Sequence, residues 1–211
     1  MTEKALLFAG GTLTGPPAVS ETDFVIAVDS GLDHCLKFQI TPQLVLGDFD
    51  SVSHEALAWA KTRQLKIISF PPQKNKTDTQ LAVEHAIALG AKRIEIYGGL
   101  GSRFDHSLAN VQLLLYILEL GASGMLTDGS QRVYLLTDEF TLLPERGMRF
   151  SILPLSLTIE GLTIRGARYP LTEAKIKLGD TRTISNEFTA QPVKISLRKG
   201  KALLFVCPRS L

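Results

Sequence analysis

The sequence is poor in cysteine and has no long hydrophobic run. Two cysteines, Cys35 and Cys207, occur among 211 residues and lie far apart. This usage excludes a disulfide framework and a cysteine-rich metal cluster and is typical of a reducing compartment, so we expect a cytoplasmic protein. No uncharged stretch reaches the ~18 residues that a transmembrane helix needs. The apolar run at residues 5–9 is too short for a signal peptide core, so secretion is not expected.

The sequence also lacks an excess of charge of either sign. Lys and Arg total 23 against 21 Asp and Glu, a formal net charge of +2. No general attraction to nucleic acid or to an anionic membrane is therefore predicted, and an anionic ligand must be bound by local groups. The length allows one large domain or two small ones with a full hydrophobic core.

The first part of the chain has the rhythm of an α/β fold. Short apolar runs at residues 5–9, 24–28, 44–46, 66–70 and 93–97 alternate with helical segments, which predicts βαβ units around a parallel sheet. The clearest helix is predicted to begin at Thr77, with Gln80 completing a capping box, and to end at Gly90. A second helix is expected from about His106 to Gly121.

After about residue 125 the pattern changes to short β-like runs at residues 133–136, 150–153, 193–197 and 202–206. The last two, joined through residues 198–201, are predicted to pair as a hairpin. We therefore predict an α/β domain over residues 1–130 and a smaller all-β domain over residues 131–211.

Two carboxylates follow the third predicted strand, in the segment Leu46-Gly47-Asp48-Phe49-Asp50-Ser51. Such a pair repels itself unless a cation is present, and Mg²⁺ is commonly held by one or two carboxylates together with substrate phosphates. Asp48 and Asp50 therefore suggest a metal–nucleotide site. The alternative is a surface turn in which an aspartate caps the next helix.

Polar loops follow four of the predicted strands, and the carboxyl ends of parallel strands lie at one edge of a sheet. Asp78 is a third candidate metal ligand, and Lys74, Lys76 and Arg103 can neutralise phosphate charge beside a glycine loop. Each has an alternative role: stabilisation of the helix dipole for Asp78, solvated loop charges for the lysines, a helix cap for Asp105 and a structural histidine for His106.

Together these loops resemble the thiamine pyrophosphokinase family over nearly the whole chain. The matching segments are Val28-Asp29-Ser30-Gly31, Leu46-Gly47-Asp48-Phe49-Asp50-Ser51, Lys74-x-x-Thr77-Asp78, Gly98-Gly99-x-Gly101-x-Arg103-Phe104-Asp105-His106-x-x-Ala109-Asn110 and Thr183-Ile184-Ser185-Asn186-Glu187-Phe188. The resemblance implies a Rossmann-like α/β catalytic domain, a C-terminal β-sandwich that helps to bind thiamine, and a homodimer with active sites between subunits.

The implied reaction transfers the pyrophosphoryl group of ATP to the hydroxyl of thiamine, giving thiamine diphosphate and AMP with Mg²⁺. By this resemblance the metal is held by Asp48, Asp50 and Asp78, and Arg103 steadies phosphate. Asp29 or Asp105 would accept the hydroxyl proton. The implied ATP-site residues are Asp29, Lys76, Thr77, Gly99, Arg103, His106 and Asn110, and Ser185 and Asn186 would contact the aminopyrimidine ring of thiamine.

The sequence departs from the family pattern at two positions. Asn75 stands where the family usually has aspartate, and Ser102 where it often has glycine. One rival interpretation is a nucleotide-sugar transferase, which also uses a D-x-D metal site but leaves the segment from Arg103 to Asn110 unexplained. The other is a thiamine- or nucleotide-binding module in which Asn75 abolished turnover.

Overall fold

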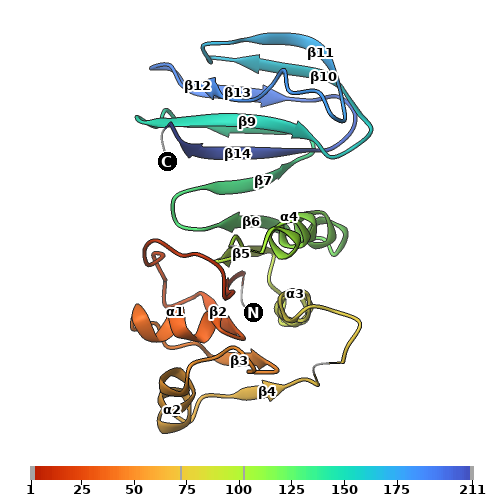
Figure 1. Cartoon of the computed structure of the whole chain (residues 1–211). Helices are drawn as coiled ribbons and strands as arrows, with labels where there is room; N and C mark the ends of the chain where they lie inside the picture. Colours follow the sequence, from red (N-terminus) through yellow and green to blue (C-terminus); the bar gives the residue numbers. More distant parts are fainter. Residues whose placement is uncertain (1–2, 72, 102, 210–211) are drawn as a thin grey trace. The chain divides into compact units, whose positions relative to one another are not determined.

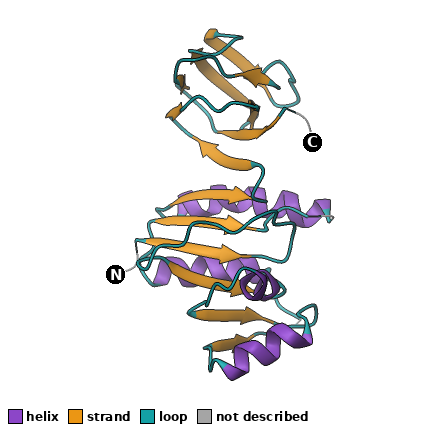
Figure 2. Cartoon of the chain, turned by 90° about the vertical axis from the view of Figure 1, so that its left-hand side faces the viewer, coloured by secondary structure: helices purple, strands orange, loops and turns teal. Residues whose placement is uncertain are grey.

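The computed structural model describes residues 3–71, 73–101 and 103–209. The chain folds into two compact units, Met1–Gly129 and Ser130–Leu211. The first contains helices and strands, and the second is drawn as strands and loops (Figure 2). Each unit is described below by itself.

The first unit is a parallel sheet with helices on both faces. The strands are β1 (Lys4–Phe8), β2 (Phe24–Val28), β3 (Leu44–Gly47), β4 (Ile67–Ser69), β5 (Arg93–Tyr97) and β6 (Ser123–Thr127), in the spatial order β6-β5-β1-β2-β3-β4. The helices are α1 (Gly31–Lys37), α2 (His54–Thr62), α3 (Asp78–Ala88) and α4 (Phe104–Glu119). Helices α1 and α2 cover one face, and α3 and α4 the other (Figure 1). The predicted α/β architecture is confirmed, and β6 adds a strand that the sequence pattern missed.

The helix ends follow the capping signals of the sequence. The Thr77 hydroxyl accepts a hydrogen bond from the Gln80 N–H at 3.2 Å, so Thr77 is the N-cap of α3. The Gln80 side chain bonds to Glu84 rather than reaching back as a capping box requires. Gly90 and Gly121 follow α3 and α4 with positive φ, as expected of glycine after a helix end. Helix α4 begins at Phe104, slightly earlier than predicted.

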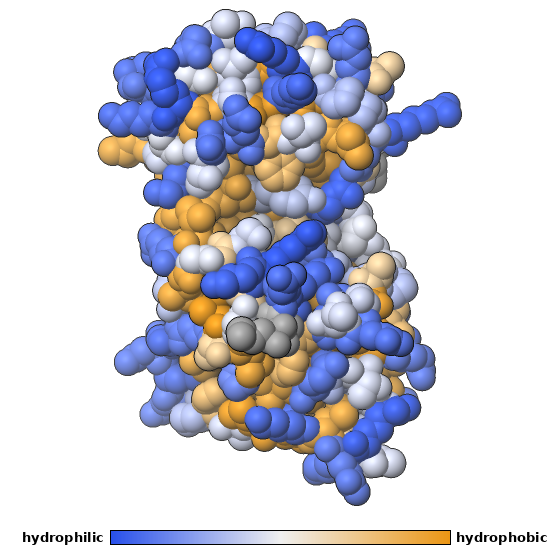
Figure 3. Space-filling model, turned by 180° about the vertical axis from the view of Figure 1, so that it is seen from behind, coloured by the Kyte–Doolittle hydropathy of each residue, from blue (hydrophilic) through white to orange (hydrophobic). Residues whose placement is uncertain are grey.

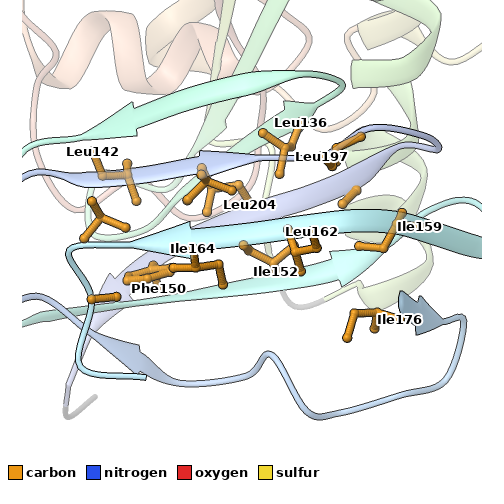
Figure 4. Close-up of a cluster of buried hydrophobic side chains, with 14 of the residues drawn as sticks. Leu136, Leu142, Phe150, Ile152, Ile159, Leu162, Ile164, Ile176, Leu197 and Leu204 are labelled. Carbon is orange, nitrogen blue, oxygen red and sulfur yellow. The ribbon is translucent and has the colours of Figure 1, made fainter. Parts of the chain in front are cut away.

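The second unit is a sandwich of two antiparallel sheets. Its strands are β7 (Arg132–Leu136), β8 (Glu139–Leu142), β9 (Met148–Pro154), β10 (Thr158–Arg165), β11 (Leu171–Lys177), β12 (Asn186–Glu187), β13 (Val193–Ser196) and β14 (Ala202–Pro208). One sheet has the order β12-β9-β14-β7, and the other β11-β10-β13-β8. Side chains such as Phe150, Ile152 and Leu204 from the first sheet meet Leu162 and Ile164 from the second in a buried core (Figure 4). The predicted all-β architecture is confirmed.

The predicted hairpin of residues 193–197 and 202–206 is wrong. Strand β13 pairs with β8 and β10, whereas β14 pairs with β7 and β9 in the opposite sheet. The backbone N–H groups of Arg198 and Lys199 both donate to the Glu160 carbonyl, and Gly200 has a φ of +99°, so the link crosses from one sheet to the other. Both strands thereby bury their apolar sides in the same core, and this packing outweighs the local turn signal.

Among the described residues, no helix is long and apolar enough to cross a membrane. Hydrophilic and hydrophobic side chains are interspersed on the face drawn in Figure 3.

Candidate active site

A cleft of about 560 Å³ lies in the first unit, where the loops that follow β1, β2, β3 and β5 meet the segment before α3. This is the edge at which open α/β sheets bind their ligands. The cleft brings together nearly every site residue predicted in this unit: Asp29, Asp48, Asp50, Lys74, Lys76, Thr77, Asp78, Gly99, Arg103, His106 and Asn110. Of the site residues predicted in this unit, all described in the structure, Asp105 does not line the cleft. The other two predicted residues, Ser185 and Asn186, belong to the second unit.

The Asp48–Asp50 loop is organised by the Asp29 carboxylate. One oxygen of Asp29 accepts a hydrogen bond from the Phe49 N–H at 3.1 Å, and the other accepts one from the Ser51 hydroxyl at 2.8 Å. Asp29 and Phe49 both have positive φ, at 50° and 64°, an unusual conformation for residues other than glycine. These bonds hold the loop that carries Asp48 and Asp50 in a fixed conformation.

Asp29, Asp48 and Asp50 form a carboxylate cluster. One oxygen from each lies within 4.8 Å of the others, close enough for a single cation to contact all three. Burial raises the pKa of Asp29, the hydrogen bond from Ser51 lowers it, and the neighbouring charges of Asp48, Asp50 and Asp78 raise it further. The repulsion among these groups is the cost that a bound cation would remove. The sequence pattern grouped Asp48 and Asp50 with Asp78, and the structure adds Asp29 to the group.

Asp78 lies in the first turn of α3 and is joined to this cluster through Lys74. The Lys74 ammonium is 3.1 Å from Asp78 Oδ2 and 3.7 Å from Asp48 Oδ2. Asp78 Oδ1 is buried and has no hydrogen-bond partner among the described residues. A buried carboxylate oxygen without a partner is costly, and hard oxygen ligands of this kind suit Mg²⁺. The residues present therefore fit a magnesium ion.

The glycine loop after β5 is held by side chains of α4. The Asn110 side-chain N–H donates to the Gly99 carbonyl at 2.8 Å, and the Gly101 N–H donates to the Ser107 hydroxyl at 3.0 Å. Ser107 is buried and was not singled out from the sequence, where a serine in the first turn of a helix gives little signal. Ser102, the second departure from the family pattern, lies outside the described residues.

Arg103 and Asp105 pair with each other at the start of α4. The Arg103 guanidinium donates to Asp105 Oδ2 at 2.8 Å, and both side chains are about two-thirds exposed, at 69% and 67%. This hydrogen bond, with one from the His106 backbone, holds the pKa of Asp105 below its usual value. The N-cap of α4 is Arg103, so the alternative role of Asp105 as the cap is wrong. An exposed pair of this kind contributes little stability, which leaves the guanidinium free to exchange partners.

Lys76 is also paired. Its ammonium lies 2.9 Å from Glu84 Oε2 on α3, and this hydrogen bond raises the pKa of Lys76. Lys74 and Lys76 therefore have different partners although they are two residues apart. Lys74 contacts carboxylates of the cleft, whereas Lys76 contacts a carboxylate that is outside the cleft lining.

In the second unit, Ser185 lies just before β12, and Asn186 is the first residue of that strand. Ser185 has a φ of 59°, and its N–H donates to the Ser151 hydroxyl at 2.9 Å. The Asn186 side chain is 6% exposed; its oxygen accepts from the Tyr169 N–H, and its amide nitrogen donates to the Tyr169 carbonyl. Asn186 therefore holds the segment at Tyr169 in place, a structural task that the motif alone does not reveal.

A polar cleft at the strand ends of a parallel sheet, followed in the chain by a β-sandwich, places the chain among the α/β proteins that bind ligands at this edge of the sheet. Comparison with known proteins specifies the family. Residues 17–123 match the family model described as thiamin pyrophosphokinase, catalytic domain, and residues 140–202 match thiamin pyrophosphokinase, vitamin B1 binding domain. The chain belongs to the thiamine pyrophosphokinase family.

Similar proteins agree with this assignment. The thiamine pyrophosphokinase of Bacillus subtilis (strain 168) is 31% identical over 177 residues, which cover 83% of each chain. A crystal structure of the Bacillus subtilis enzyme superimposes with a TM-score of 0.88 at 29% identity, covering 99% of this chain and 100% of that one. The structure from Geobacillus thermodenitrificans gives a TM-score of 0.86 at 27% identity, with 98% of both chains covered. The predicted family, fold class and thiamine pyrophosphokinase activity are confirmed.

Proposed function

We propose that the cleft of the first unit binds ATP with Mg²⁺ and that the chain transfers the pyrophosphoryl group to the hydroxyl of thiamine, giving thiamine diphosphate and AMP. The observation that carries the metal assignment is the gathering of Asp48, Asp50 and Asp78 around one cleft, where a buried Asp78 oxygen has no partner among the described residues. Held by Asp48, Asp50 and Asp78, a magnesium ion would supply charge neutralisation at the polyphosphate and would favour in-line attack.

The other residues of the cleft bind and orient the reactants. Arg103 and His106 are exposed at the start of α4, where cationic and N–H groups can donate to phosphate oxygens. Gly99 and Thr77 line the cleft, and Asn110 fixes the glycine loop. We assign Asp29, rather than Asp105, as the acceptor of the proton from the thiamine hydroxyl. Asp29 lines the cleft, whereas Asp105 is bound to Arg103 at the surface.

The thiamine site is proposed for the second unit, at Ser185 and Asn186. Ser185 would contact the aminopyrimidine ring through its hydroxyl, which lies 3.4 Å from an Arg149 nitrogen. Asn186 would act mainly by holding the segment at Tyr169. For the compartment we propose the cytoplasm, in keeping with Cys35 and Cys207, which are both free thiols.

A homodimer is proposed as the functional unit, with active sites between subunits. Phe104 and Leu108 lie one turn apart on α4 and are 78% and 46% exposed, an apolar pair that a partner would cover. We expect sedimentation velocity to give a dimer and Phe104→Ser to shift it toward monomer, with Leu157→Ser, which changes an apolar residue that is 82% exposed in the second unit, as the control. A monomeric wild-type chain at micromolar concentration would contradict the dimer.

Product analysis tests the proposed reaction directly. Purified protein is mixed with thiamine, ATP and Mg²⁺, and adenine nucleotides and thiamine esters are separated by chromatography. Equal amounts of AMP and thiamine diphosphate are expected. Formation of ADP with thiamine monophosphate would instead mean transfer of the terminal phosphoryl group alone, and would contradict the proposal.

Asn75 is expected to have little influence on catalysis in this chain. It is exposed and, unlike Asp78, is not among the residues that line the cleft. Because exposed charges are strongly screened, Asn75→Asp should change kcat by no more than about twofold. Steady-state kinetics with saturating thiamine measure this change. A tenfold gain would mean that the family's aspartate takes part in the reaction and that this chain is impaired without it.

A further inference from the structure

Lys74 places its charge among the carboxylates that would hold a metal ion. Its ammonium contacts Asp78 Oδ2 at 3.1 Å and Asp48 Oδ2 at 3.7 Å, and it donates to the Pro71 carbonyl at 3.3 Å. The three N–H donors of an ammonium group can thus each be directed at an oxygen. The side chains of Lys74, Asp48 and Asp78 are 14%, 14% and 18% exposed, so the group is largely shielded from water.

This arrangement balances charge in a crowded site. Four carboxylates, those of Asp29, Asp48, Asp50 and Asp78, line one cleft, and Lys74 bridges two of them. The neighbouring Lys76 pairs with Glu84, and Arg103 pairs with Asp105, so both have their nearest carboxylate outside the cleft lining. Among these three basic residues of the cleft, Lys74 is therefore the one that forms ion pairs with predicted metal ligands.

We propose that Lys74 is an internal competitor of the divalent cation, an inference that rests on the proposed metal role of Asp48 and Asp78. A magnesium ion lies about 2.1 Å from its oxygen ligands, so an ammonium at hydrogen-bond distance from the same carboxylates would be strongly repelled. Lys74 must withdraw before both carboxylates coordinate a metal, and its flexible four-carbon stem allows this movement. Asp78 Oδ1 is buried and has no partner in the described residues, so this carboxylate keeps an unused oxygen ligand while Lys74 holds Oδ2.

The competition has a consequence for how metal enters the site. The free cation has to displace Lys74 at the full cost of its ion pairs. A metal–nucleotide complex brings phosphate oxygens that can accept the released ammonium, so part of that cost is recovered. The site thereby discriminates in favour of metal that arrives together with a polyphosphate and against free metal.

The test measures binding of MgCl₂ alone, by isothermal titration calorimetry in the absence of nucleotide, and thermal unfolding in EDTA. For Lys74→Gln we expect about tenfold tighter magnesium binding, equivalent to about 1.4 kcal/mol. Metal-free Lys74→Gln should also unfold roughly 3 °C below wild type, because its carboxylates lose their counter-charge. Lys74→Arg keeps the charge and should stay close to wild type in metal binding.

Lys76→Gln is the matched control, since it removes the same charge from the same segment while its ammonium pairs with Glu84. Its magnesium affinity should change much less than that of Lys74→Gln. Unchanged or weaker magnesium binding in Lys74→Gln, or an equal gain in Lys76→Gln, would overturn the competition. Asp48→Asn and Asp78→Asn separate the two proposals: if both retain wild-type magnesium affinity, the proposed metal ligands are wrong, whereas their loss of binding beside an unaltered Lys74→Gln rejects the competition alone.

Discussion

Asp48→Asn is expected to lower the rate of thiamine diphosphate formation roughly 1000-fold while the chain remains folded. Asp48 lies in the carboxylate cluster with Asp29 and Asp50 and is paired with Lys74, which also contacts Asp78. Asparagine keeps the size of the side chain and one carbonyl oxygen but removes the negative charge that a divalent cation requires. The rate of AMP and thiamine diphosphate formation under saturating substrates gives the measurement.

Two further measurements separate a lost metal ligand from a damaged fold. Asp48→Asn should bind magnesium more weakly by calorimetry, and its unfolding temperature without metal should equal or exceed that of wild type, because the carboxylate repulsion is relieved. Glu55→Gln, which neutralises an exposed carboxylate in the first turn of α2, serves as the control and should retain the wild-type rate. A folded Asp48→Asn enzyme with near-normal turnover would refute the metal role.

Much of the first unit could be predicted from local signals. Strands β2 and β5 coincide with the predicted runs at residues 24–28 and 93–97. Strand β2 is continuously apolar, as buried parallel strands commonly are, whereas β5 alternates Ile94 and Ile96 with Arg93, Glu95 and Tyr97. Helix α3 follows Thr77 and ends before Gly90, because capping side chains and glycine act on their own immediate backbone. The convergence of polar loops could be anticipated as well, because parallel strands deliver their carboxyl ends to one edge.

The features that sequence reasoning missed depend on contacts between distant segments. The partners of β13 and β14 are set by packing in the sandwich core, about which the short link through residues 198–201 carries no information. The bonds from Asp29 to the loop at Phe49 and Ser51 join residues about twenty positions apart. Lys74 could be identified as a basic residue near the site, yet its position between Asp48 and Asp78 required the three-dimensional structure.

Gly31→Ala is expected to destabilise the first unit by roughly 3 kcal/mol and to lower its unfolding temperature by roughly 10 °C. Gly31 begins α1 directly after the Asp29–Ser30 loop. A methyl group at this position would lie 1.8 Å from the Phe8 carbonyl oxygen and 2.4 Å from its carbon. Both atoms belong to the backbone of β1, a buried central strand, so rotating a side chain cannot relieve the overlap.

The same substitution should reduce activity beyond its effect on stability. Helix α1 has to move away from β1, and this movement carries Asp29, whose carboxylate holds the loop of Asp48 and Asp50. Gly15→Ala is the matched control, because a methyl group there meets no atom of the described chain within 4 Å. Thermal unfolding followed by circular dichroism should therefore separate the two variants clearly. Equal unfolding temperatures for Gly31→Ala and Gly15→Ala would mean that α1 does not pack against β1 as closely as the structure has it, and the positioning of Asp29 would need another explanation.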